Sequence, residues 1–267
     1  MEAIVKFRQH LKARYLCLGA SISFTDPLVT DALGDCVDFF WIDTEHCSMS
    51  PEALQGHLLA ARARNVPALV RVGCGSTPYI KAALDAGAEG IIVPLVRSAE
   101  EVRQIVGDCR YPPVGRRGFG PRVPSNYGRN GGSEYIERAN SSIFVAVQIE
   151  TKEALEAIDD ILGVPGLDSL VIGPWDLSGA LGRLGDVHHP EVVAAIETII
   201  SKTRAAGLSV GAGMNADADF ACIMAERGVQ WIQLGGDFGY LVKFMDQITA
   251  TVRARLSRGI EAAGSSS

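Results

Sequence analysis

Short apolar runs alternate with amphipathic helical patterns along almost the whole 267-residue chain, and this alternation limits the folds that the chain can adopt. Continuous apolar strands are typical of a parallel sheet that is covered on both faces. Eight strand–helix repeats in about 250 residues favour a closed α/β TIM barrel, (β/α)8, over an open doubly wound sheet. The expected strands are residues 16–20, 39–43, 68–72, 90–93, 143–149, 169–172, 209–213 and 230–234. The expected helices are residues 26–33, 51–64, 78–86, 99–107, 152–162, 191–206, 217–227 and 238–255.

Capping residues support this order of elements. The segment Ser50-Pro51-Glu52 combines an N-cap residue, a proline at the first helical position and an acid in the first turn. Gly87 and Gly207 follow helical patterns, at positions where a left-handed cap residue fits. We expect one barrel domain over residues 1–258 and a disordered tail over residues 259–267.

Composition excludes several classes of protein. The net charge of −6 argues against nucleic acid as a partner, because phosphate binding needs a basic face. No apolar run approaches the roughly 20 residues that span a membrane, and the N-terminus lacks the long apolar core of a signal peptide. The six cysteines are scattered without a Cys-x-x-Cys pair, so neither a disulfide framework nor a zinc site is expected. These features predict a cytoplasmic protein without a membrane partner.

Two carboxylates follow neighbouring strands of the predicted barrel. Glu150 comes directly after the apolar run 143–149, and Asp176 lies four residues after the run 167–172. The carboxyl ends of parallel strands meet at one edge, where active sites form. Two oxygen ligands on a rigid rim suit a hard divalent cation that keeps water and binds substrate. The sequence therefore predicts a metal site at Glu150 and Asp176.

Two other strand ends carry candidate catalytic groups. His46 lies just beyond the second strand, three residues after Asp43, which suits an acid/base with an orienting carboxylate. A loop histidine without a role is the alternative. Arg71 lies within the apolar third strand, where a charge is costly unless it is paired or faces an anion. Its alternatives are a structural salt bridge and a substrate contact.

A long segment between residues 109 and 133 interrupts the alternation of predicted strands and helices. It is rich in Arg, Gly and Pro, and a loop of this length in a compact domain is usually functional or disordered. Two roles are possible for its arginines, namely binding of a carboxylate or exposure to solvent without a specific partner. These are Arg116, Arg117, Arg122 and Arg129.

A set of short motifs on successive strands resembles the metal-dependent class II pyruvate aldolases, whose relatives include oxaloacetate decarboxylases of the macrophomate synthase type. The similarity runs over nearly the whole chain, and the order of the motifs is more specific than any one of them. The motifs are Asp43-x-Glu45-His46, Val70-Arg71-Val72, Val93-Pro94-Leu95-Val96, Gly115-x-Arg117-Gly118, Gln148-Ile149-Glu150-Thr151 and Ile172-Gly173-Pro174-x-Asp176-Leu177-Ser178.

The resemblance implies a barrel of the phosphoenolpyruvate/pyruvate type whose last helix is exchanged between subunits of a homohexamer, a trimer of dimers. It implies Mg²⁺, Mn²⁺ or Co²⁺ on Glu150 and Asp176, and no organic cofactor. Pyruvate or another 2-oxo acid, such as oxaloacetate, would bind at the turn Gly173-Pro174-Trp175-Asp176, with backbone N–H groups of Trp175 and Asp176 on its carboxylate. Gln148 would lie beside the metal-bound waters. Asp85 matches a position that can reach a histidine of a neighbouring subunit.

The implied reaction is the retro-aldol cleavage of a 4-hydroxy-2-oxo acid to pyruvate and an aldehyde, and its reverse. Arg71 would stabilise the enolate oxygen. His46, oriented by Asp43 or by the partner subunit's Asp85, would move the C4-hydroxyl proton. Three alternatives stay open: an oxaloacetate decarboxylase, a citrate-lyase-β-like enzyme acting on a coenzyme A thioester, and a non-catalytic barrel.

Two further features bear on the chemistry. Lys81, Lys152, Lys202 and Lys243 all fall on helical patterns, which argues against a Schiff-base aldolase. The position of Trp175 usually carries a small residue in the resembling family, and the segment 121–127 matches the family's pattern only in part. Both departures leave the acceptor aldehyde undefined.

Overall fold

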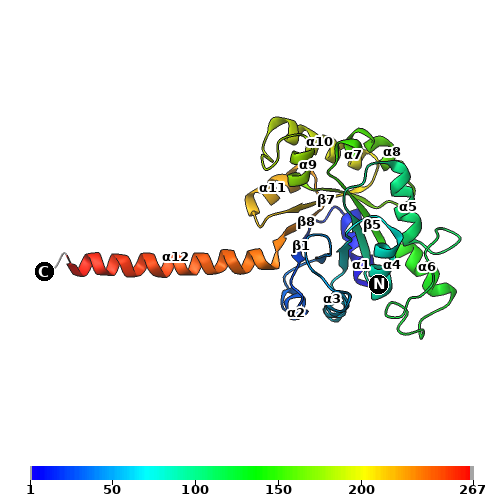
Figure 1. Cartoon of the computed structure of the whole chain (residues 1–267), viewed down its shortest axis with the longest axis horizontal. Coiled ribbons are helices and arrows are strands. Elements are labelled where there is room, and N and C mark those ends of the chain that lie inside the picture. The colour runs from blue at the N-terminus through cyan, green and yellow to red at the C-terminus, as the bar shows by residue number, and fades with distance from the viewer. Residues whose placement is uncertain (1, 265–267) are drawn as a thin grey trace.

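The computed structural model describes the backbone of residues 2–264 and the side chains of residues 2–257. Its strands form a closed parallel barrel in the order β1 to β8, surrounded by helices, as Figure 1 shows. The predicted TIM-barrel fold is thereby confirmed. The strands are β1 (Cys17–Ile22), β2 (Phe39–Asp43), β3 (Ala68–Arg71), β4 (Gly90–Val93), β5 (Phe144–Ile149), β6 (Ser169–Ile172), β7 (Ser209–Met214) and β8 (Trp231–Gly236). The helices are α1 (Glu2–Lys12), α2 (Leu28–Leu33), α3 (Pro51–Ala63), α4 (Thr77–Ala86), α5 (Ala99–Cys109), α6 (Ser133–Ser142), α7 (Lys152–Glu156), α8 (Ile158–Leu162), α9 (Pro174–Ala180), α10 (Pro190–Ala205), α11 (Ala218–Arg227) and α12 (Asp237–Gly264).

Every expected strand coincides with an observed one to within about two residues, but several helices differ from the expected ones. The pattern over 152–162 is two short helices, because Ala157 leaves helical geometry at φ −92° and ψ 12°. Helices α6 and α9 were not expected. The caps are as predicted: Ser50 Oγ accepts from the Ala53 amide at 3.2 Å, and Gly87 and Gly207 have positive φ.

Helix α1 closes the amino-terminal end of the barrel. Its Phe7 ring lies 5.4 Å from that of Phe39, 5.5 Å from that of Phe144 and 6.3 Å from that of Trp231, measured between ring centroids. These three partners are the first residues of β2, β5 and β8. Gly211 on β7 accommodates the Trp231 ring, which a Cβ atom there would overlap. The aromatic cluster therefore fills this end of the barrel and leaves the other end for chemistry.

Strand register decides which residues meet at the carboxyl-terminal end. Asp43 on β2 is the Cα partner of Arg71 on β3, and Ile149 on β5 is the partner of Ile172 on β6. The chain that follows each of these strands therefore leaves the barrel side by side with its neighbour's. Glu150 and the turn that contains Asp176 are adjacent for this reason.

Helix α12 projects away from the barrel, as Figure 1 shows. It continues to Gly264 and so includes residues 259–264, which the sequence analysis assigned to a disordered tail. Residues 265–267 of that tail lie outside the described residues. None of the described helices combines the length and apolar character that crossing a membrane requires.

Candidate active site

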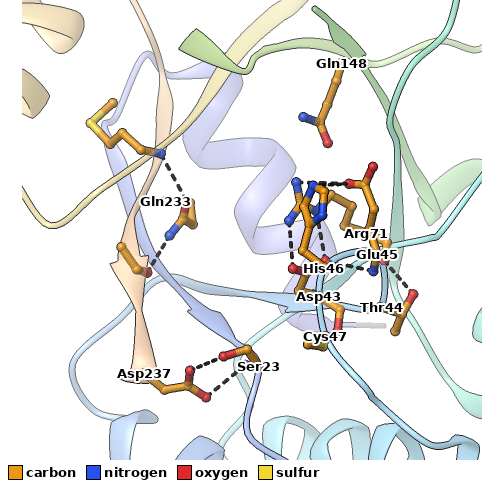
Figure 2. A network of polar contacts seen from close by, with 12 residues as sticks. Ser23, Asp43, Thr44, Glu45, His46, Cys47, Arg71, Gln148, Gln233 and Asp237 are labelled. Atoms are coloured by element: carbon orange, nitrogen blue, oxygen red, sulfur yellow. Dashed lines mark hydrogen bonds and ion pairs between the residues drawn. The ribbon is translucent and has the colours of Figure 1, made fainter. Parts of the chain in front are cut away.

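The candidate site lies at the carboxyl-terminal end of the barrel, where β2, β3, β5 and β6 end beside one another. Figure 2 shows Asp43, Glu45, His46 and Arg71 gathered at one side of this end, with Gln148 directed toward them from β5. The structure thus brings together most of the side chains that the sequence predicted for the site.

Arg71 is held by two carboxylates. Its Nε donates to Asp43 Oδ1 at 2.9 Å and its Nη2 to Asp43 Oδ2 at 2.7 Å. Its Nη1 lies 3.1 Å from Glu45 Oε2, and its guanidinium carbon lies 5.4 Å from the centre of the Trp41 ring. Burial alone would lower the pKa of Arg71, but the bonds to Asp43 and the charge of Glu45 raise it. The arginine is therefore a fixed cation, and the salt bridge considered from the sequence is present.

Glu45 is a site residue to which the sequence analysis gave no role. Its Oε2 contacts both Arg71 Nη1, at 3.1 Å, and His46 Nε2, at 3.6 Å. Burial raises the pKa of Glu45, as do the charges of Asp43 and Asp176, while Arg71 and His46 lower it. The motif Asp43-x-Glu45-His46 contains this residue, so the sequence did carry a signal for it.

His46 has a different neighbour from the one expected. Its side chain is 65% exposed, and the carboxylate beside it is Glu45. Asp43 Oδ1 accepts from the Glu45 amide at 3.0 Å, and both of its oxygens face Arg71. Asp43 therefore positions Arg71, and the expectation that it orients His46 is not what these contacts show.

Asp85 lies on α4, away from this group. Its Oδ1 accepts from Arg117 Nη2 at 2.8 Å. Its expected contact with the histidine of a neighbouring subunit remains a prediction. Arg117 is itself buried and stacks over Tyr111, with 4.5 Å from its guanidinium carbon to the ring centre. Arg116 pairs with Asp108 at 2.6 Å. Two of the four loop arginines are thus engaged in ion pairs within the chain.

Glu150 is buried and held by two donors. The Leu95 amide donates to its Oε1 at 2.8 Å, and Gln148 Nε2 donates to its Oε2 at 2.6 Å. Burial raises the pKa of Glu150 to about 7, and the charges of Asp176 and Glu45 add to the effect, which the Leu95 bond and Arg71 oppose. An ionised Glu150 therefore has too little positive charge nearby to offset its own negative charge.

The turn after β6 lies against this carboxylate. A Cβ atom on Gly173 would come within 2.6 Å of Glu150 Oε2 and 3.3 Å of Gln148 Nε2, so the turn can approach this carboxylate so closely only with glycine at this position. Pro174 is buried at the start of α9, and Asp176 follows in its first turn. Trp175 is half exposed, with its ring against Gly185.

Leu95 adopts an unusual backbone conformation beside Glu150. Its φ is 55°, in the left-handed region that costs a residue with a side chain about 1 kcal/mol. Two bonds fix the segment: the Leu95 amide donates to Glu150, and Thr151 Oγ1 donates to the Val96 carbonyl at 2.8 Å. The sequence contains no pattern that predicts this conformation, since leucine rarely adopts it.

No group of three or more His, Cys, Asp or Glu side chains among the described residues is arranged to hold a metal ion. A site at Glu150 and Asp176 would thus rely on water and substrate for its remaining ligands. The four lysines considered from the sequence lie on α4, α7, α10 and α12, and none of these four ends a strand.

A family profile described as HpcH/HpaI aldolase/citrate lyase matches residues 22–243. The chain belongs to this family. Its resemblance to pyruvate aldolases is thereby confirmed. Among similar proteins, a hydroxypyruvate/pyruvate aldolase of Pseudomonas aeruginosa is 33% identical over 91% of each chain. A 2-keto-3-deoxy-L-rhamnonate aldolase of Escherichia coli K12 is 35% identical, over 87% of this chain and 84% of that one.

Solved structures of this family share the fold. A crystal structure of an HpcH/HpaI aldolase/citrate lyase family protein from Burkholderia cenocepacia J2315 has a TM-score of 0.87 and 29% sequence identity. It covers 93% of this chain and 99% of its own.

The buried Glu150 carboxylate gives a testable dependence of stability on pH. Its pKa in the folded state, about 7, lies above the ordinary 4.5. The protein without bound metal should therefore lose stability as pH rises from about 4.5 through 7, by up to about 3 kcal/mol, and keep it below that window. Chemical denaturation of chelated protein should show this loss, and Glu150→Gln should remove it. The exposed Glu153→Gln is the control, and equal slopes in both variants would contradict the assignment.

Proposed function

We propose that this protein cleaves a 4-hydroxy-2-oxo acid into pyruvate and an aldehyde, reversibly, with a divalent cation on Glu150 and Asp176. The observation that carries the proposal is the buried Glu150, held by Gln148 and the Leu95 amide, with the backbone of Gly173 packed closely against its carboxylate. Its occurrence in a chain similar to a hydroxypyruvate/pyruvate aldolase supports pyruvate as the common product.

The residues present fit a divalent cation. Gln148 Oε1 is buried without a hydrogen-bond partner, so an acceptor faces the site unused. The raised pKa of Glu150 reflects burial and neighbouring carboxylates, a condition that a bound cation would relieve. Glu150 and Asp176 would hold Mg²⁺, Mn²⁺ or Co²⁺, whose hard oxygen-seeking chemistry suits them. When bound, such an ion polarises a keto group and stabilises negative charge on its oxygen.

The chain's own groups would bind and orient the substrate. Backbone N–H groups of Trp175 and Asp176 would hold the 2-oxo acid's carboxylate. Arg71 directs three of its five N–H groups at the carboxylates of Asp43 and Glu45, which leaves two N–H groups for the developing enolate oxygen. His46, exposed beside Glu45, would take the C4-hydroxyl proton as C3–C4 breaks.

Pyruvate enolate chemistry provides the direct test. We expect the methyl protons of pyruvate to exchange with solvent in D₂O, followed by NMR, when Mn²⁺ or Mg²⁺ is added to chelated protein. The Glu150→Ala variant should lose this exchange, because the carboxylate that would hold the cation is removed. Glu153→Ala, on exposed α7, is the matched control. Absence of exchange with every metal would overturn the proposal.

Cleavage and decarboxylation should respond differently to loss of His46. His46→Ala is expected to lower kcat for retro-aldol cleavage by 10²-fold or more, and to affect oxaloacetate decarboxylation less, since that reaction has no C4-hydroxyl proton. Arg71→Ala should impair both reactions, because both form the same enolate. Equal losses of the two activities in His46→Ala would remove the histidine from the proton transfer.

Helix α12 supports a proposal about assembly. Apolar side chains are exposed along most of the described part of this helix, which is unusual for a helix in solution. They are Phe238, Leu241, Val242, Phe244, Met245, Ile248, Val252 and Leu256. We propose that α12 packs on a neighbouring subunit of a homohexamer, as the resemblance implies.

Charges on this face should separate the subunits. The double variant Leu241→Glu and Met245→Glu, which changes neighbours one turn apart, should form a smaller species in light scattering than the unchanged protein. Gln247→Glu on the same helix adds a charge at an exposed polar position and should leave the mass unchanged. An unchanged mass in the double variant would place the interface elsewhere.

A further inference from the structure

A cavity of about 590 Å³ opens at the amino-terminal end of the barrel, at the end opposite the candidate active site. It is bordered by α1, by the first residues of β5 and β7, and by the segments that follow α10 and α11. Its charged lining residues are Arg8, Lys12, Arg14, Asp168, Arg204 and Glu226. Cations therefore outnumber acids here, in a chain whose net charge is −6.

One of the two lining acids, Asp168, is already neutralised. Arg8 Nη2 donates to its Oδ1 at 2.6 Å, and Arg110 Nη2 lies 3.6 Å from its Oδ2. Arg110 is buried, and its Nη1 has no hydrogen-bond partner. Because arginine stays protonated, two arginines and one carboxylate leave a formal positive charge beside the cavity.

Three further cations are exposed at this cavity. Within the part of the chain that the structure describes, Lys12, Arg14 and Arg204 form no ion pair. The guanidinium of Arg204 lies across Gly228, another lining residue, since a Cβ atom on Gly228 would overlap Arg204 Nη1. The positive charge of the lining is therefore available to a ligand.

Arg14 has a backbone conformation that favours glycine. Its φ is 59°, and it lies in a Schellman motif in which the Arg14 amide donates to the Leu11 carbonyl at 3.1 Å and the Tyr15 amide to the His10 carbonyl at 2.9 Å. The same pair of bonds ends α3, α4, α9, α10 and α11. The left-handed residue there is Asn65 in α3 and glycine in the others, Gly87, Gly182, Gly207 and Gly228. The motif explains the conformation of residue 14 but not its guanidinium group.

Helix dipoles provide one explanation for these cations. The carboxyl ends of α1, α10 and α11 meet at this cavity, and a cation near such an end is favourable. Lys12 and Arg204 lie in the last turns of their helices, where this role suits them. A dipole interaction does not require that cations from two helices line one cavity, however. The two explanations differ in whether an anion binds.

We propose that this cavity binds a small organic anion with about two negative charges, through Lys12, Arg14 and Arg204. Phosphate monoesters and dicarboxylates share this chemistry, because a guanidinium group binds phosphate and carboxylate in the same bidentate way. Apolar lining residues would contact the carbon skeleton of the anion; they include Leu11, Leu16, Phe144 and Val229. The proposal does not depend on the reaction proposed for the opposite end of the barrel.

Calorimetric titration of metal-free protein with inorganic phosphate and with succinate tests this site. Removal of metal leaves the carboxylates around Glu150 without a cation, which disfavours anion binding at that end. The unchanged protein should bind at least one of the two anions saturably, and the tighter one identifies the group that is recognised. Arg14→Gly should weaken this binding about ten-fold or more, because it removes a charge-assisted hydrogen bond. Arg204→Gln should act in the same direction.

A matched variant separates this role from a structural one. Arg14→Gly keeps the bonds of the Schellman motif and relieves the strained φ, so its thermal midpoint should stay close to that of the unchanged protein. Asn65→Gly makes the same kind of change at the end of α3 without removing a charge, and it should leave anion binding unchanged.

The outcomes decide between the two explanations. Absence of saturable binding of both anions by the unchanged protein would overturn the proposal and leave the dipole role of the cations. Equal affinities of the unchanged protein and a folded Arg14→Gly variant would also overturn it, as would equal weakening in Asn65→Gly. Pyruvate proton exchange is a separate measurement, and its failure would bear only on the proposed function.

Discussion

The charge distribution of the site depends on how the Arg71 guanidinium is shared between the carboxylates of Asp43 and Glu45. Parallel strands bring their carboxyl ends to a single edge, and here that edge carries more acids than bases. Arg71 is bonded on two atoms by Asp43 and approached on the third by Glu45, so its position and charge are fixed. Glu150 has no such partner and relies on two neutral donors. That difference divides the site into a half whose charges are largely neutralised, around Arg71, and a half with excess negative charge, around Glu150.

Side-chain and backbone bonds between neighbouring loops hold these halves in place. Thr44 Oγ1 donates to the Arg71 carbonyl at 2.7 Å and so joins the ends of β2 and β3. Thr151 Oγ1 does the same for the ends of β4 and β5, through the Val96 carbonyl. Groups held in this way need little rearrangement when charge develops, which is the usual source of electrostatic catalysis. The rigidity of the site therefore comes from hydroxyl groups beside the charged residues.

The barrel, and the gathering of most candidate site residues at one end of it, could be predicted from the sequence because their signals are local. Apolar runs mark the strands, and a polar residue directly after a run marks the active edge. The short helix α9 was missed because its glycine and proline suggest a loop. The prediction that Asp43 orients His46 came from their spacing in the sequence, whereas the register of β2 and β3 places Asp43 beside Arg71. The left-handed Leu95 depends on Glu150, far away in the chain, so no local pattern reveals it.

The aromatic cluster under α1 has a consequence for the order of events at the other end. Phe7, Phe39 and Trp231 close the floor of the barrel, so small molecules reach the described site from its open mouth. On the proposed function, pyruvate binds at Glu150 in the interior and the aldehyde binds nearer the rim. The molecule that enters first is then the last to leave. On that proposal, the closed floor would give ordered kinetics with pyruvate as the final product released, and no moving lid would be required.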